Sequence, residues 1–303
     1  MKIRLYIVTF KRNEVLNENL RSLWASTPPG SLQQVTVLAN HPSVAIDPEN
    51  QRDNLRVVLN QPRMPFAWGN LSKDWNYALL DGFRAWNNPD NVDWVILAQN
   101  NIVWRPGWLD ELAKHTRLQF ISQPTGDQVL AFRIGAVRRV GFFDERFATL
   151  HFHEVDYFNR AALQLGHEAS INDDHHGHSS GWNHVGCFMI NPTHTGPVEK
   201  DNLHTMRFWP EMAGILIEKW RLRGPDELHS LSTLMKRREE VLAQLPREIN
   251  AYPFFWDGCP TLPASLLWYR DLAKKAQPTP PSQPVSMAFR VRRKLRRIFG
   301  QTP

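Results

Sequence analysis

The chain has 303 residues, of which 42% are hydrophobic and 22% charged, as in soluble globular proteins with one large domain or two smaller ones. No apolar run reaches the ~18–20 residues of a membrane-spanning helix, and Met1–Arg4 leads into a predicted strand without a signal-peptide pattern. Cys187 and Cys259 are far apart and have no metal-binding spacing. We therefore expect a reducing compartment, the cytoplasm.

The net charge of +6 comes from the end of the chain. Six cations fall within the last 14 residues, with no acid among them: Arg290, Arg292, Arg293, Lys294, Arg296 and Arg297. Because the sequence has 36 basic and 30 acidic residues in total, these six account for the whole net charge. A nucleic-acid enzyme is usually basic over its working face, so we expect no nucleic-acid partner.

Apolar runs and helical repeats alternate along the first 112 residues. Strands are predicted at residues 5–8, 35–38, 55–59 and 92–98. Helices are predicted from Leu16 to Trp24, before Pro28–Gly30, and from Asn76 through Trp86. This alternation predicts an α/β fold with a mostly parallel sheet flanked by helices.

The stretch Val92–Leu112 combines a predicted strand with a polar turn. Three amides, Gln99, Asn100 and Asn101, follow the strand, and Pro106-Gly107 then turns the chain into a helical pattern. Polar side chains just past a buried strand lie where open α/β sheets bind ligands. The alternative is an amide-rich turn without a ligand.

The same stretch resembles family-two glycosyltransferases of the GT-A fold, which is Rossmann-like. Members carry an apolar strand, then D-x-D or N-N-D, two apolar residues and P-G-W/F-L-x-x-L. Residues Trp94–Leu112 fit this frame, with Gln99-Asn100-Asn101 in place of the acidic motif. The resemblance implies a GT-A domain that binds a nucleotide-sugar donor.

Earlier segments resemble donor-binding parts of that family. Val8–Arg12 is similar to V-T-Y-N-R, the loop that seats the nucleotide base, and Ala39-Asn40 stands where many members have Asp-Asn. Asn76 lies in a segment similar to A-R-N-x-G-L. The resemblance implies these donor-binding residues: Thr9, Phe10, Arg12, Asn40, Asn76, Gln99, Asn100 and Asn101.

The segment His153–Arg160 resembles E-D-V-D-L-x-x-R, which holds the catalytic base of the family. In the matching register Glu154 takes the position of the base, His153 that of the preceding Glu, and Asp156 a supporting position. Residues 140–147 resemble V-G-G-F-D-E-R-F, whose acids we interpret as structural or acceptor-side. The alternative for Glu154 and Asp156 is a charged helix N-terminus, where the helix dipole favours acids.

A divalent cation, Mn²⁺ or Mg²⁺, usually neutralises a diphosphate leaving group. Neutral amides hold a hard cation less strongly than carboxylates, so the amide motif predicts a weak metal site, a metal-free site or an inactive one. Asn101 is the candidate ligand there. His175 and His176 are further candidates, in a run similar to V-x-H-H-G of the family, for which the alternative is a solvated polar loop. We expect weak dependence on Mn²⁺ or Mg²⁺.

The alternation stops after residue 190. We predict a catalytic domain at 1–190, a helical C-terminal extension at 191–277 with helices at 208–220, 226–245 and 262–276, and a Pro-rich linker and tail at 278–303. In the tail, apolar residues recur every three or four positions among the cations: Ala288, Val291, Leu295 and Ile298. This pattern is typical of a helix in a membrane interface. The alternative is a disordered basic end.

The predicted function is transfer of a sugar from a nucleotide-sugar donor to a glycan or lipid-linked acceptor, with inversion, in cell-surface polysaccharide or lipopolysaccharide synthesis. We expect a cytoplasmic enzyme that binds an anionic membrane peripherally through its tail. One alternative is a sugar-nucleotide- or glycan-binding protein of the same fold that has lost catalysis. A nucleotidyltransferase would usually have a glycine-rich phosphate loop after the first strand, and Thr9–Asn13 contains no glycine.

Overall fold

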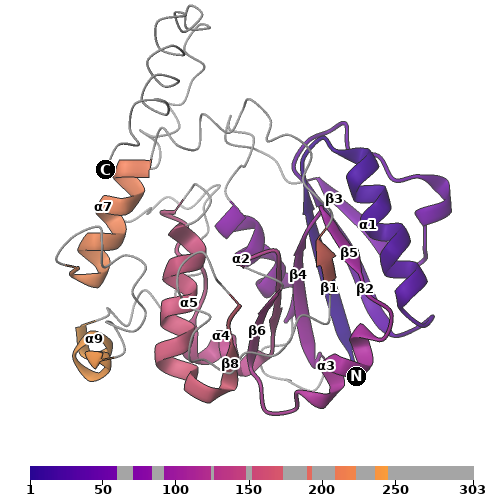
Figure 1. Ribbon diagram of the computed structural model, residues 1–303. Coiled ribbons are helices and arrows are strands. Elements are labelled where there is room, and N and C mark those ends of the chain that lie inside the picture. Colours follow the sequence, from indigo (N-terminus) through magenta and orange to yellow (C-terminus); the bar gives the residue numbers. More distant parts are fainter. Residues whose placement is uncertain are drawn as a thin grey trace, which may run out of the picture.

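The computed structural model describes residues 1–59, 71–83, 92–123, 126–147, 152–172, 190–192, 209–222 and 236–244. A seven-stranded sheet lies at the centre, and helices cover both of its faces (Figure 1). None of the helices in the described residues is long and apolar enough to cross a membrane.

The sheet has the strand order β3-β2-β1-β4-β7-β6-β8. Its strands are β1 (Ile3–Thr9), β2 (Leu32–Ala39), β3 (Leu55–Leu59), β4 (Trp94–Gln99), β6 (Phe120–Gln123), β7 (Val129–Phe132) and β8 (Ala169–Ser170). Strand β7 is antiparallel to both of its neighbours, and the other pairs are parallel. A separate antiparallel pair joins β5 (Ile102–Trp104) to β9 (Ile190–Pro192).

The helices follow the apolar repeats of the sequence. They are α1 (Asn13–Ser26), α2 (Leu71–Gly82), α3 (Trp108–Lys114), α4 (Ile134–Val140), α5 (Phe152–Leu165), α7 (Trp209–Trp220) and α9 (Arg238–Gln244), with short 3₁₀ turns η1 (Pro48–Asn50) and η3 (Gly166–Glu168).

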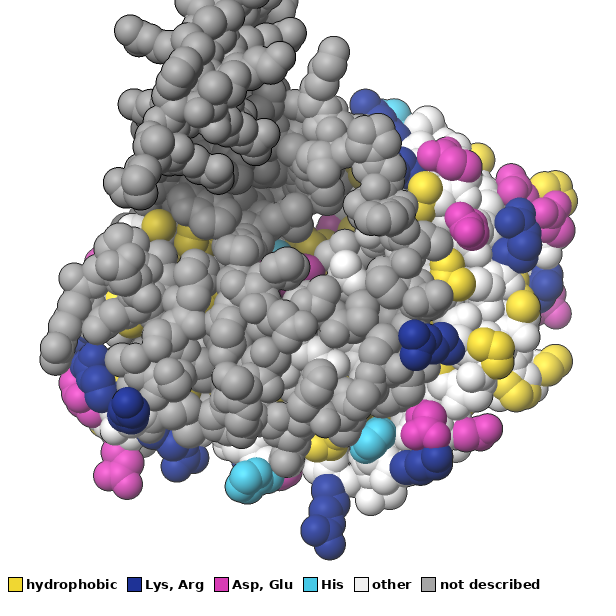
Figure 2. Space-filling model, in the orientation of Figure 1, with side chains coloured by type: hydrophobic (Ala, Val, Ile, Leu, Met, Phe, Trp, Pro, Cys, Tyr) yellow, Lys and Arg dark blue, Asp and Glu magenta, His cyan; other side chains and the backbone are white. Residues whose placement is uncertain are grey.

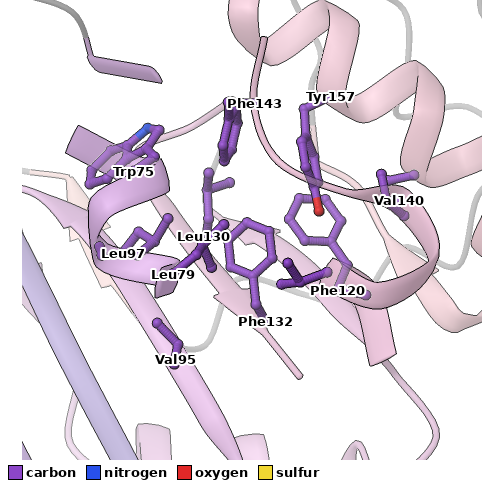
Figure 3. Packing of buried hydrophobic residues seen from close by; sticks show 14 of the residues in the cluster. Trp75, Leu79, Val95, Leu97, Phe120, Leu130, Phe132, Val140, Phe143 and Tyr157 are labelled. Carbon is purple, nitrogen blue, oxygen red and sulfur yellow. The ribbon is translucent and has the colours of Figure 1, made fainter. Parts of the chain in front are cut away.

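Alternation along β1 divides the core between the two faces of the sheet. Leu5 and Ile7 point to the face covered by α1 and α3, and Tyr6 points to the face covered by α2, α4 and α5. On the second face, aromatic side chains from β6, β7 and α5 pack together, and the rings of Phe143 and Tyr157 stack at 4.4 Å (Figure 3). Each fully buried large apolar side chain stabilises the fold by about 1.5–3 kcal/mol.

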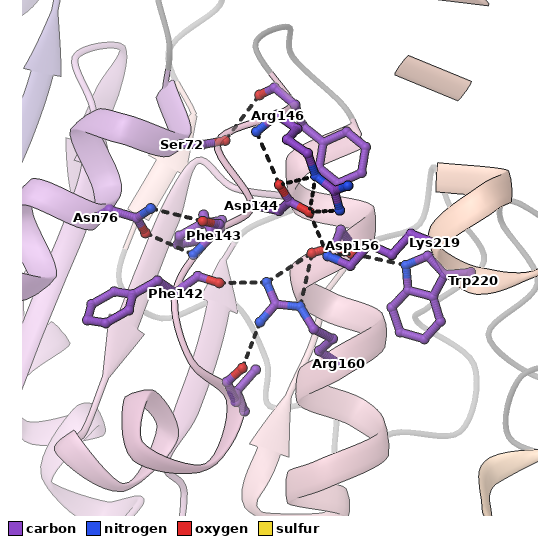
Figure 4. A network of polar contacts seen from close by, with 12 residues as sticks. Ser72, Asn76, Phe142, Phe143, Asp144, Arg146, Asp156, Arg160, Lys219 and Trp220 are labelled. Atoms are coloured by element: carbon purple, nitrogen blue, oxygen red, sulfur yellow. Dashed lines mark hydrogen bonds and ion pairs between the residues drawn. The ribbon is translucent and has the colours of Figure 1, made fainter. Parts of the chain in front are cut away.

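A buried charge network ties α7 to α5 (Figure 4). Lys219 Nζ lies 2.6 Å from Asp156 Oδ1 and 2.9 Å from Asp144 Oδ2, and the Trp220 indole donates to Asp156 Oδ1 at 3.0 Å. Arg160 donates to Asp156 Oδ2 and to the carbonyls of Val140 and Phe142. Because Lys219, Asp144 and Asp156 are almost entirely buried, the network fixes the first turns of α5 against α7.

Charges on the visible surface are mixed in sign. In Figure 2, acidic and basic side chains alternate over the described residues around α1 and do not gather into a stripe of one sign. Arg21 of α1 and Glu49 form an exposed ion pair with a distance of 3.2 Å.

The predicted α/β fold with a mostly parallel sheet flanked by helices is confirmed. Helix α2 ends at Gly82, and the predicted helix end at Trp86 lies outside the described residues. Helix α7 occupies nearly all of the predicted helix 208–220, and α9 lies within the predicted helix 226–245. Strand β9 spans the predicted domain boundary at residue 190, and the division into domains stays a prediction. The predicted helix 262–276 and the tail 278–303 lie outside the described residues.

Candidate functional site

Several predicted site residues gather at one edge of the sheet. Because β1, β2 and β4 are parallel, their last residues lie side by side: Thr9 pairs with Ala39, and Val8 with Gln99. Strand β7 is antiparallel to β4 and begins opposite Ala98. The loop before β7, with Asp127, therefore reaches the same edge, where open α/β sheets bind ligands.

A buried asparagine of α1, Asn19, forms hydrogen bonds with the backbone of the amide turn after β4. Asn19 Nδ2 donates to the carbonyl oxygens of Gln99 and Asn100 at 3.1 and 3.2 Å. Its Oδ1 accepts from the Trp104 indole at 2.9 Å. Asn19 is fully buried, so these contacts replace its hydration and fix the turn in one conformation.

The side chains of this turn contact the neighbouring strand ends. Asn100 Nδ2 donates to Thr9 Oγ1 at 3.0 Å, and Gln99 Nε2 donates to Asp127 Oδ1 at 2.8 Å. Asn101 is 9% exposed. These contacts connect the predicted donor-binding residues of β1 and β4 to an acid that the sequence analysis did not identify.

Asp127 is the centre of a buried cluster with the first turn of α5. Its Oδ2 lies 2.8 Å from His153 Nε2, and its main-chain N–H donates to Glu154 Oε2 at 3.0 Å. Asp127, His153 and Glu154 are 6%, 1% and 8% exposed. One potential ligand atom from each lies within 4.8 Å of the other two, the only such group among the described residues.

Gly126 lets the loop approach Glu154 closely. Its φ is +58°, in the left-handed region that glycine tolerates best, and its N–H donates to the carbonyl of Asn172. A Cβ added at this position would lie 3.0 Å from Glu154 Oε2. The backbone of Gly126-Asp127 therefore determines where the Glu154 carboxylate lies.

The electrostatics of the cluster favour an ionised Asp127. Burial alone would raise the pKa of Asp127, but the hydrogen bond and charge of His153, with smaller effects from Glu154 and Trp75, lower that pKa below its ordinary value. The cluster thus combines a stable carboxylate, an imidazole and a second carboxyl group in a space from which most water is excluded.

The remaining predicted donor-binding residues near this edge are Asn40, Phe10 and Arg12. Asn40 follows β2 and donates to Asp74 Oδ2 at 2.5 Å. Phe10 is half-buried and contacts the His41 ring edge-on at 5.4 Å. Arg12 precedes α1 and accepts the first helical hydrogen bond, from Leu16.

Two predicted site residues have side chains turned into the protein. Asn76 exchanges hydrogen bonds with the backbone of Phe143 and donates to Glu145 Oε1 at 3.0 Å (Figure 4). Asp156 is fully buried in the network of Lys219 and Arg160. Binding of the donor by Asn76 stays a prediction, as does a supporting role for Asp156. His175 and His176 lie outside the described residues.

Sequence reasoning missed Asp127, although one signal was present. Gly126-Asp127 is a turn-forming pair one residue before the apolar run Val129–Phe132. A polar residue at the start of a buried strand next to β4 has to lie at the edge where Gln99 ends that strand. The antiparallel pairing of β7 with β4 brings Asp127 to this edge, and no local sequence pattern predicts that pairing.

The amide motif and the cluster differ in their fit to a cation. Gln99, Asn100 and Asn101 offer only neutral oxygens, and two of the three amides donate to Asp127 and Thr9. The cluster offers two carboxylates and an imidazole. Carboxylates are the stronger ligands for divalent cations, so the cluster is the better candidate metal site among the described residues.

No protein-family model and no curated protein matches the sequence. Solved structures that align with the chain include glycosyltransferases. The mannosyltransferase PcManGT from Pyrobaculum calidifontis, in complex with GDP-Man and Mn²⁺, aligns with 99% of this chain and 88% of its own at 12% identity and a TM-score of 0.48. S. aureus TarS 1-349 in complex with UDP-GlcNAc aligns over 83% of each chain at 13% identity and a TM-score of 0.45.

Proposed function

We propose that the protein is a GT-A-type glycosyltransferase that moves a sugar from a nucleotide-sugar donor to a hydroxyl acceptor. The main observation in support of the proposal is the position of the Glu154 carboxylate. Its carboxylate accepts the Asp127 N–H at 3.0 Å, at the ligand-binding edge of the sheet and beside the amide turn. The resemblance of 94–112 and 153–160 to the donor and base motifs of family-two glycosyltransferases adds independent support.

In the proposed reaction Glu154 is the general base. The acceptor oxygen forms a bond to the anomeric carbon while the bond from that carbon to the diphosphate oxygen breaks. Glu154 takes the proton of the acceptor hydroxyl, and the nucleoside diphosphate leaves with the electron pair. In-line attack without a covalent intermediate inverts the anomeric carbon.

The donor would lie across the ends of β1, β2 and β4. Thr9 and Asn40 end or follow two of these strands, and the half-buried Phe10 ring offers an apolar face to a nucleobase. Arg12 supplies a cation to the diphosphate. Asn76 is the further donor-binding candidate, and its side chain also contacts residues 143–145.

A divalent cation bound with the donor would offset the charge of the diphosphate. The amides of residues 99–101 suit such a cation poorly, with Asn101 as the candidate ligand, and His175 or His176 would have to complete the site. We therefore infer weak dependence on Mn²⁺ or Mg²⁺.

The acceptor would be a glycan or a lipid-linked sugar in cell-surface polysaccharide synthesis. The basic tail 278–303 would bring the enzyme to the anionic inner face of the membrane from the cytoplasm. This part of the proposal is supported by the sequence pattern alone.

One observation favours a second candidate, a sugar-nucleotide-binding protein without catalysis. Gln99 and Asn100 already donate to Asp127 and Thr9, so the motif that usually holds the metal is engaged within the protein.

A panel of UDP-, GDP- and dTDP-sugars, assayed for hydrolysis and transfer with and without Mn²⁺, separates the two candidates. Binding of one donor with turnover that Glu154→Gln abolishes supports the enzyme. Binding of a donor without turnover, under any metal condition and with any acceptor, supports the binding protein.

A further inference from the structure

We propose that Asp127, His153 and Glu154 form a site for a divalent transition-metal ion of the Zn²⁺ class, and that a metal bound there blocks the base. The site itself stands on the described geometry. The blocking effect rests on the proposed function, in which Glu154 takes the proton of the acceptor.

The distances suit a single small cation. A tetrahedral zinc ion with bonds of about 2.0–2.2 Å needs ligand atoms about 3.4 Å apart. The three potential ligand atoms lie within 4.8 Å of one another, and His153 Nε2 and Asp127 Oδ2 are 2.8 Å apart. Small side-chain rotations would let a cation replace the proton between these two atoms.

The donor set selects the class of metal. One imidazole nitrogen and two carboxylate oxygens suit Zn²⁺, Co²⁺ or Mn²⁺, whereas Mg²⁺ prefers oxygen ligands with several waters. A dication would also offset the negative charge of carboxylates that are shielded from water.

Hydrogen bonds within the protein already hold the potential ligand side chains in place without a metal. Gln99 holds the other oxygen of Asp127 at 2.8 Å, and the Asp127 N–H holds Glu154. His153 and Glu154 are adjacent on the first turn of α5, which the buried contacts of Asp156 fix against α7. Preorganised ligands lose little conformational entropy on binding.

Metal binding and catalysis exclude each other at this cluster. When the Glu154 carboxylate coordinates a cation, the positive charge makes it a much weaker base, and it takes the proton of the acceptor far less readily. A metal here therefore has the opposite effect to a metal on the diphosphate: it inhibits turnover.

The first experiment measures binding directly. Metal-free full-length protein is titrated with ZnCl₂ by calorimetry and with CoCl₂ by visible absorption. We expect one tight site, and we expect Asp127→Asn, His153→Gln and Glu154→Gln each to weaken it by at least about tenfold. His115→Gln, which removes a histidine at the end of α3, should leave the affinity unchanged. Circular dichroism and the melting temperature establish that each variant is folded.

The outcomes are distinct. Unchanged affinity in all three folded cluster variants overturns the proposal, as does a site that only a His175→Asn and His176→Asn double variant removes. Loss of affinity in the cluster variants supports the site even if no donor is ever turned over, because the readout is binding.

The second experiment concerns the blocking effect and uses the wild-type enzyme alone. The Zn²⁺ concentration for half-inhibition of transfer should equal the dissociation constant from calorimetry, and EDTA should restore the activity. Activation by Zn²⁺ at that concentration contradicts the blocking effect.

Discussion

Asp144 and Glu145 are consecutive buried residues whose carboxyl groups have pKa values shifted in opposite directions. Burial raises both, but the charges and hydrogen bonds of Lys219 and Arg146 reverse the shift at Asp144 and hold its pKa far below the ordinary value. At Glu145 burial prevails over the hydrogen bond from Asn76, and the nearby carboxylates of Asp144 and Asp74 add to the upward shift of its pKa. One acid is thus built into an ion network, and its neighbour favours the neutral form.

This contrast predicts opposite effects of amide substitutions on stability. The pKa of Glu145 is higher in the folded than in the unfolded protein. Its contribution to the stability of the fold is therefore fully present at pH values below the unfolded-state pKa, and it is lost as the pH rises through the folded-state pKa. Because Gln cannot ionise, Glu145→Gln should stabilise the protein at alkaline pH and have a smaller effect at acid pH. Thermal melts from about pH 5 to about pH 9 measure the difference.

Asp144→Asn is the matched control. The contribution of Asp144 is present above its unfolded pKa and is lost only as the pH falls through its lower folded value. Removing one partner of a buried ion pair costs about 3–5 kcal/mol, so this variant should be destabilised at neutral pH. Equal shifts in both variants would contradict the assignment of the two environments.

The next prediction concerns the base. Glu154→Gln keeps the size of the side chain and the hydrogen bond from Asp127, but cannot take a proton. We expect kcat to fall by at least about 10²-fold, with donor affinity unchanged in calorimetry. Asp156→Asn, two residues away in the buried network, should instead lower the melting temperature. Near-full activity of Glu154→Gln together with an inactive but folded Asp156→Asn would show that the motif register is wrong.

Gly126 allows a subtler test of the same carboxylate. In Gly126→Ala, the new Cβ would lie 3.0 Å from Glu154 Oε2, so the base should shift and kcat should fall while donor affinity stays the same. The left-handed conformation adds a cost of about 1–2 kcal/mol. Gly30→Ala is the control, because Gly30 has a similar φ of +80° but nothing within 4 Å of the added Cβ. It should lose stability and keep its kcat, and an equal loss of kcat in both variants would remove the role of Gly126.

The tail prediction is tested by liposome flotation of the full chain and of a chain ending at Pro280. Each Lys or Arg near an anionic surface contributes about 1 kcal/mol before ordering costs, so the full chain should float with anionic vesicles, less so in high salt. The truncated chain should stay in solution. Identical behaviour of the two proteins would refute membrane binding by the tail.

The strands at the centre of the sheet could be predicted because each is rich in buried apolar residues, as in 5–8 and 94–98. Strands β6 and β7 have four residues each, and β6 ends in Ser122 and Gln123, which are polar yet fully buried. No pattern of alternating polarity marks such a strand, and its polar groups are satisfied only in the folded sheet.

Some residues of the candidate site can likewise be predicted from local sequence, and others depend on the tertiary fold. The amide turn and Glu154 lie in local motifs, so the sequence alone could identify them as candidates. Asp127 lies 26 residues from His153 and meets it only when β7 pairs with β4. The side chains of Asn76 and Asp156 also lie in motifs, but their burial against 143–145 and α7 is a tertiary property.

The last prediction concerns metal dependence. Because the amides of residues 99–101 are neutral, the transfer reaction should retain substantial activity in EDTA. Complete loss in EDTA with recovery on Mn²⁺ would refute this and would point to ligands among His175, His176, Asp173 and Asp174. Asn101→Asp adds the missing carboxylate and should tighten Mn²⁺ binding if residue 101 faces the cation. Titration of Mn²⁺ followed by electron paramagnetic resonance measures this affinity without relying on activity. Carried out in the Asp127→Asn background as well, it separates a cation at the amide turn from one at the cluster, because only the former persists when Asp127 is changed.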